Sequence, residues 1–80
     1  MKIATVIGSL EPTRRAPGTE QVRWVQVRTD EEILTAADPV GVQPGELVLV
    51  ATGAGAGHYR MDFRTDALIV AVLEENGNNG

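Results

Sequence analysis

The segment Gly53-Ala54-Gly55-Ala56-Gly57-His58 holds the residues from which a binding or catalytic site would most readily be built. A glycine-rich turn after an apolar strand can bind a dinucleotide, but that fingerprint has the spacing Gly-x-Gly-x-x-Gly and opens a helix. Here the spacing is Gly-x-Gly-x-Gly, no helical pattern follows, and 80 residues are too few for the two halves of such a fold. The Gly-Lys-Ser/Thr ending of a phosphate-binding loop is also absent. The segment therefore predicts a tight loop in which small residues let backbones approach closely.

A small hydrolase is the enzyme class that the remaining residue types would allow. Ser9, His58 and Asp66 could supply a Ser-His-Asp triad, and the chain has no cysteine that could act as a nucleophile instead. A triad also needs an oxyanion site and a pocket, and a domain of this size has little volume for one. We therefore expect no catalysis, and we expect His58 at the surface or at the rim of a pore.

The charged pairs and the tryptophan have structural interpretations that are preferred over functional ones. Glu31-Glu32 and Glu74-Glu75 fall in turns or at strand ends and indicate solvated charges. Arg14-Arg15 lies in a proline-containing loop. A solvent-exposed position for these two arginines is favoured over a contact with a partner, although arginine is enriched at interfaces. Trp24, in the middle of a strand, is expected to pack in the core or at a subunit interface.

Composition excludes several classes of function. The chain has no cysteine and one histidine, so neither a disulfide, a metal site nor a cofactor is expected. Its 11 acidic residues against 7 basic ones and its three aromatic residues argue against a nucleic-acid surface. No apolar run approaches the roughly 18 residues of a membrane span, and the first residues do not read as a signal peptide. We therefore expect a soluble cytoplasmic protein.

The hydrophobic pattern predicts an all-β chain. Residues rich in β-branched side chains alternate with glycine- and proline-containing turns, and the predicted strands are residues 1–10, 21–29, 33–38, 47–51 and 67–73. Gly8 predicts a bulge in the first strand. Pro44-Gly45 predicts a type II turn, because glycine accepts the positive φ of its second central position. Residues 59–65 are predicted to be irregular, with room for one helical turn at residues 54–59.

Several of these strands carry apolar residues on both faces. Val22 and Trp24 share one parity while Val25 and Val27 share the other, so either both faces are apolar or a bulge lies between Trp24 and Val25. The continuous run at residues 47–51 predicts burial on both sides. Five short strands in a chain of this length suggest a small barrel or a compact sandwich. One such interior cannot bury this much apolar surface, so we expect an oligomer.

Three segments in register resemble the EutN/CcmL family of bacterial microcompartment vertex proteins. The opening MKIATVIGSL, with Pro-Thr-Arg-Arg soon after it, resembles the start of the family. Residues 37–49 (ADPVGVQPGELVL) are similar to its Ala-x-Asp-x-Val-Gly-x-x-x-Gly-x-x-Val-Leu segment. Residues 65–74 (TDALIVAVLE) are similar to its Asp-x-x-Ile-Val-x-Ile terminal strand. The resemblance covers residues 1–74, which we expect to form one domain, with residues 75–80 as a polar tail.

This resemblance implies a five-stranded OB-like β-barrel that assembles into a cyclic pentamer. Such pentamers cap the vertices of polyhedral shells, as in carboxysomes and metabolosomes, whose facets are tiled by different, hexameric proteins. The role is structural and not enzymatic, and a narrow pore lies on the five-fold axis. A stand-alone OB-like module that binds a small ligand or an oligonucleotide is the alternative.

The resemblance also directs attention to particular residues. The segment Gly53-Ala54-Gly55-Ala56-Gly57-His58 is expected at the five-fold axis. The family usually has Gly-Ser-Ser/Ala-Ala-Arg there, so His58 and Arg60 are the candidates to replace its arginine. Expected subunit or shell contacts are Arg14, Arg15, Trp24, Asp38 and Asp66, and the acidic residues 30–32 share with Arg14 and Arg15 the expected place at the pentamer rim.

Overall fold

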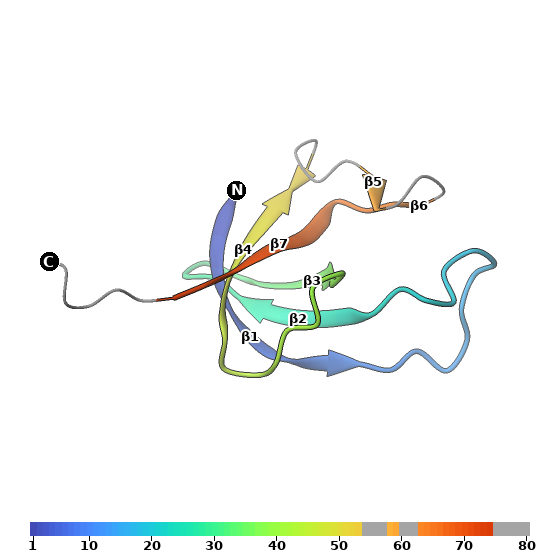
Figure 1. Ribbon diagram of the computed structural model, residues 1–80, viewed down its shortest axis with the longest axis horizontal. Helices are drawn as coiled ribbons and strands as arrows, with labels where there is room; N and C mark the ends of the chain where they lie inside the picture. The colour runs from blue at the N-terminus through green and yellow to red at the C-terminus, as the bar shows by residue number, and fades with distance from the viewer. Residues whose placement is uncertain (54–57, 60–62, 75–80) are drawn as a thin grey trace, which may run out of the picture.

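The computed structural model describes residues 1–53, 58–59 and 63–74, and the regular elements within them are mainly strands. The strands are β1 (Lys2–Leu10), β2 (Trp24–Arg28), β3 (Ile33–Ala37), β4 (Leu47–Thr52), β5 (His58–Tyr59), β6 (Phe63–Arg64) and β7 (Ala67–Leu73). Five of them close into a barrel in the order β1-β2-β3-β7-β4, and β5 and β6 pair separately (Figure 1). The expected five-stranded OB-like barrel is thereby confirmed over a sandwich.

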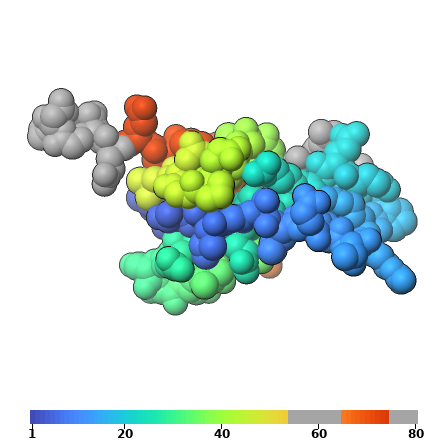
Figure 2. Space-filling view, turned by 90° about the horizontal axis from the view of Figure 1, so that it is seen from below, coloured from blue at the N-terminus to red at the C-terminus, as the bar shows by residue number. Residues whose placement is uncertain are grey.

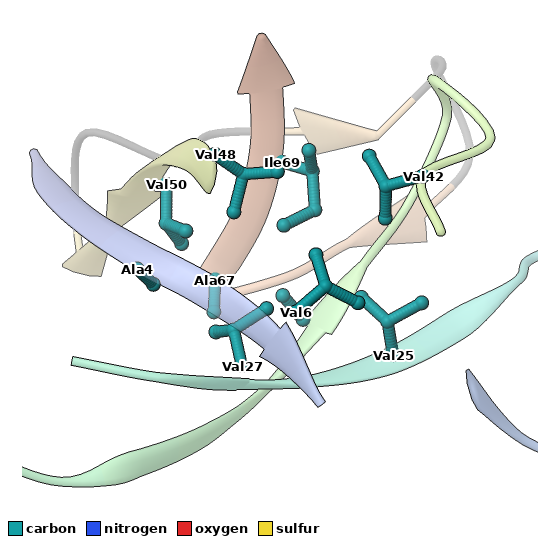
Figure 3. Close-up of a cluster of buried hydrophobic side chains, with 10 residues drawn as sticks. Ala4, Val6, Val25, Val27, Val42, Val48, Val50, Ala67 and Ile69 are labelled. Carbon is teal, nitrogen blue, oxygen red and sulfur yellow. The ribbon is translucent and has the colours of Figure 1, made fainter. Parts of the chain in front are cut away.

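The barrel interior is lined by alternate residues of its strands, which meet at its centre (Figure 3). Valine dominates because β-branched side chains suit both the strand backbone and a tightly packed interior. The buried cluster consists of Ala4, Val6, Val25, Val27, Ala36, Val42, Val48, Val50, Ala67 and Ile69.

A second, smaller apolar cluster lies outside the barrel interior. Val22 and Ala37 are buried there, with Trp24 and Leu68 packed against them. The register between β2 and β3 runs without interruption from Trp24 to Arg28. The alternative in which both faces of β2 carry apolar residues is therefore correct, and no bulge lies between Trp24 and Val25.

Two register shifts let the strands curve around the barrel. One lies in β1 between Val6 and Gly8 and confirms the bulge predicted at Gly8. The other lies between Leu49 and Val50 of β4, where Val70 is the extra residue of β7. Bulges increase local twist and bend the strand, which barrel closure requires.

The predicted type II turn is also confirmed. Gly45 has a φ of 90°, and the Glu46 amide donates to the carbonyl oxygen of Gln43 at 3.2 Å. Gly45 N–H and Glu46 C=O then bond to the backbone of Val6. The turn thus attaches the start of β4 to β1.

Some sequence-based expectations were wrong. β2 starts at Trp24 rather than at residue 21, because residues 20–23 turn into the strand and Val22 packs in the second cluster. Residues 59–65 are not wholly irregular, since β5 and β6 form a short hairpin there. The proposed helical turn fails at His58 and Tyr59, which are strand, while residues 54–57 lie outside the described part.

The run at residues 47–51 is not buried on both sides, because Leu47 and Leu49 remain half-buried at the outside of the barrel.

Within the described residues, the structure contains no helix with the length and apolar character needed to cross a lipid bilayer.

Candidate functional site

Asp38, expected at an interface, is buried inside its own chain. One carboxylate oxygen, Oδ1, accepts the backbone N–H groups of Val40 at 3.0 Å and Gly41 at 2.9 Å. The other, Oδ2, accepts the N–H of Val42 at 2.9 Å. The side chain has no exposed area, so any contribution to an interface is made through the loop that it holds.

Arg23 completes this arrangement from the residue just before β2. Its Nε lies 3.1 Å from Asp38 Oδ2, and its Nη2 donates to the carbonyl oxygen of Val42 at 2.7 Å. The backbone carbonyl of Arg23 accepts the N–H of Asp38 at 2.8 Å. The buried carboxylate is therefore paired and hydrogen-bonded on both oxygens, which is the condition for burying a charge at acceptable cost.

The Arg23–Asp38 pair fixes residues 38–42 in one conformation. Gly41 has a φ of 90°, a value that residues with a side chain rarely adopt. Val42 is completely buried in the barrel cluster, while Val40 at the tip of the same loop is 48% exposed. The loop thus closes part of the barrel interior and presents a rigid apolar tip to the outside.

The two neighbouring arginines of the long β1–β2 loop have different surroundings. Arg15 Nη1 donates to the carbonyl oxygens of Thr19 at 2.8 Å and Val22 at 2.5 Å. Arg15 therefore organises its own loop, which extends away from the barrel at the end opposite the β2–β3 turn (Figure 1). Arg14 is exposed, and it is the member of the pair with the freer guanidinium for a contact with another molecule.

The acidic turn between β2 and β3 is held from within. Thr29 Oγ1 accepts the N–H groups of Glu31 at 3.1 Å and Glu32 at 3.0 Å. Lys2 Nζ lies 3.0 Å from Glu32 and 3.8 Å from Glu31. The hydrogen bond and the charge of Glu32 raise the pKa of Lys2 above its ordinary value.

Two open hollows border this turn, of about 510 Å³ and about 280 Å³. Neither is lined by Ser9, His58 or Asp66, the residues of the conceivable triad. Among the described residues, no group of three or more His, Asp or Glu side chains could hold a metal ion.

Of the remaining predicted site residues, the structure describes Gly53, His58, Asp66 and Trp24. Gly53, with a φ of 60°, donates its N–H to the carbonyl oxygen of Asp66 at 2.8 Å and so joins the end of β4 to the start of β7. Asp66 is exposed, and Trp24 is half-buried against the second cluster. His58 begins β5, whereas Ala54, Gly55, Ala56, Gly57 and Arg60 lie outside the described residues.

Sequence reasoning missed the Arg23–Asp38 pair. Arg23 falls inside the predicted strand of residues 21–29, and its place there gives no sign of a partner 15 residues further along the chain. The available signal was the Asp-x-x-Gly spacing at Asp38 and Gly41, which is typical of a carboxylate that accepts N–H groups of the following turn.

Comparison with solved structures gives close matches along nearly the whole chain. A pentameric shell protein of the RMM microcompartment, MSM0273, is 31% identical, with a TM-score of 0.80 over 92% of this chain and 91% of that one. CsoS4B from Halothiobacillus neapolitanus is 28% identical, with a TM-score of 0.80 over 94% of this chain and 100% of that one. EutN from Escherichia coli is 27% identical, with a TM-score of 0.77 over 94% and 87%.

No curated protein matches the chain in sequence. The family model described as ethanolamine utilisation protein EutN/carboxysome matches residues 1–74, which include the whole barrel and the Arg23–Asp38 pair. The chain therefore belongs to the EutN/CcmL family.

Proposed function

We propose that this chain is a structural protein that forms a ring of five and closes the vertices of a bacterial microcompartment shell. The observation that supports this most directly is the match to a pentameric shell protein, which is 31% identical over 92% of the chain. The family match over residues 1–74 and the likeness to CsoS4B and EutN point to the same role. The protein accordingly resides in the shell of a microcompartment in the cytoplasm.

The role follows from symmetry. In a ring, each subunit contacts the next through two different surfaces, and the ring closes when the rotation between neighbours divides the full circle. A flat layer of hexamers has no curvature, whereas a five-fold unit at a corner introduces it. Hexameric shell proteins are therefore the proposed partners at the outer edge of the ring.

The residues support a structural role rather than a catalytic one. The buried carboxylate of Asp38 accepts three backbone N–H groups of residues 40–42, and the partly exposed Arg23 pairs with it and donates to the carbonyl oxygen of Val42. We assign no reaction to this chain, because the family match and the likeness to shell proteins support a structural role.

Within the ring, the segment that starts at Gly53 and ends at His58 is proposed to surround the five-fold axis. Its small residues allow five copies of the backbone to approach one another. Arg14 and the acidic turn are proposed to lie toward the rim. Arg15 is a weaker candidate for the rim, because its guanidinium is engaged by its own loop.

Shell closure tests this function. Hexameric shell proteins of one compartment would be co-expressed with and without this chain, and the products would be compared by electron microscopy. With the chain present, closed polyhedra that carry it at their corners are expected. Without it, the shells are expected to remain unclosed. Equal closure without the chain, or a chain that stays monomeric and binds single-stranded nucleic acid, would contradict the proposal and favour the OB-like binding module.

A further inference from the structure

Outward-facing positions of β1, β4 and β7 are unusually apolar. Ala4 on β1 and Val48 and Val50 on β4 point into the barrel, so the residues between them point outward. Ile3 lies directly opposite Leu49, and Leu49 lies opposite Ala71, which gives one apolar row across three strands. Residues opposite each other in antiparallel strands share a face, so these three side chains lie together.

A second row runs beside the first. Leu47 lies opposite Thr5 on one side and Leu73 on the other. Thr5 is therefore the one polar residue in the two rows. We call these six positions the outer sheet face: Ile3, Thr5, Leu47, Leu49, Ala71 and Leu73.

The other side of the barrel has the ordinary pattern. Gln26 lies opposite Thr35, and Arg28 follows on the outer side of β2, so polar groups face the solvent there. An antiparallel sheet with one solvated face normally alternates apolar-in with polar-out. Apolar residues on the outside of β2 and β3 gather at one end, where Trp24 lies opposite Ala37 in the second cluster, and Ile33 is exposed opposite Arg28 at the other end.

The outer sheet face is partly accessible in the single chain, since Ile3 and Thr5 are exposed and the other four residues are half-buried. Ile3 is 59% exposed, and its strand runs along the surface between the green β2–β3 turn and the yellow-green segment before β4 (Figure 2). Lys2, Glu31 and Glu32 form charged pairs next to it. An apolar centre with a charged border is the usual anatomy of a protein–protein interface.

The occupant that fits this surface is a second copy of the chain. Permanent homomeric interfaces resemble a divided core and are more apolar than contacts with exchangeable partners. In a ring of five, the same face of each subunit contacts a neighbour, so each of the five subunit interfaces buries one copy of this apolar surface. We infer that the outer sheet face is one of the two surfaces through which neighbouring subunits join, and this inference rests on the proposed pentamer.

A matched pair of substitutions tests this location. Ile3→Thr and Ile33→Thr make the same chemical change at similar exposure, 59% and 55%, and threonine keeps the β-branched shape that a strand favours. Leu49→Thr repeats the test on the neighbouring strand. Circular dichroism checks that each variant retains the barrel, and mass photometry over a dilution series measures the concentration at which half of the rings dissociate.

Ile3→Thr and Leu49→Thr are expected to raise that concentration by about tenfold or more, whereas Ile33→Thr changes it by less than about threefold. Rings of unchanged tightness in Ile3→Thr and Leu49→Thr would overturn the inference while the pentamer itself stands. Intact rings of these two variants that no longer join hexameric shell proteins would also overturn it. A wild-type chain that never forms pentamers would remove the proposed function itself.

Discussion

Arg23 Nε lies 3.1 Å from Asp38 Oδ2, and the same arginine donates to the carbonyl oxygen of Val42 at 2.7 Å. One side chain thus binds both ends of a five-residue loop. Because Val42 is buried in the barrel and Val40 is exposed at the loop tip, this pair connects the order of the core to the shape of the surface.

Removing the carboxylate should be costly. Asp38→Ala leaves three backbone N–H groups without their acceptor, and we expect it to lower the free energy of unfolding by about 2–4 kcal/mol. Arg23→Met keeps the aliphatic stem and the three N–H bonds, so a smaller loss of about 1–3 kcal/mol is expected. Urea unfolding at one fixed protein concentration measures both, since assembly also stabilises the folded state. A larger loss for Arg23→Met than for Asp38→Ala would contradict this order.

The backbone of the same loop gives a second prediction. Gly41→Ala is expected to cost about 1–2 kcal/mol, because a φ of 90° is unfavourable for a residue with a Cβ atom. Gly8→Ala is the control, with a change within about 0.5 kcal/mol. A Cβ at either position meets no atom within 4 Å, so the comparison isolates backbone conformation from crowding. Equal effects in thermal unfolding would show that the φ of Gly41 is not the determining factor.

The arginines of the β1–β2 loop should differ in their effect on loop order. Arg15→Met removes two hydrogen bonds to the carbonyls of Thr19 and Val22 and is expected to speed cleavage within residues 11–22 by subtilisin several-fold. Arg14→Met should leave the cleavage rate near that of the wild type. Subtilisin is preferred to trypsin because its cleavage does not require arginine. Identical rates for the two variants would speak against a role of Arg15 in holding the loop.

The Lys2–Glu32 pair predicts a weak dependence of stability on alkaline pH. The folded-state pKa of Lys2 is raised above 10.5, mainly by its hydrogen bond to Glu32. Its stabilising effect is therefore complete below pH 10.5 and is lost as the pH rises through the folded-state pKa. Lys2→Met should be slightly less stable than the wild type at neutral pH, and the difference should vanish above that range. A difference that grows at high pH would contradict this sign.

The elements that could be predicted were those with strong local signals. Short segments rich in β-branched and other apolar residues marked all five barrel strands, Gly8 marked a bulge, and Pro44-Gly45 marked its turn. The β5–β6 hairpin was missed because strands of two residues carry too little periodicity to detect. The outward exposure of Leu47 and Leu49 was missed because a continuous apolar run looks the same whether its outer face meets its own chain or another.

The contacts that depend on tertiary structure could not be predicted. Arg23 and Asp38 meet only after β2 and β3 have paired, and nothing local to either residue specifies the other. The same holds for the outer sheet face, whose rows exist only once β1, β4 and β7 are in register. Expected contact residues such as Arg14 and Asp66 were placed by family resemblance, and their roles in assembly stay predictions.

Native mass spectrometry of the purified wild-type chain tests the central claim most directly. Five copies of the 8.5 kDa chain give about 43 kDa, and we predict that this species dominates at micromolar concentration. A spectrum that contains mainly the 8.5 kDa monomer, or a dimer, would contradict the vertex role.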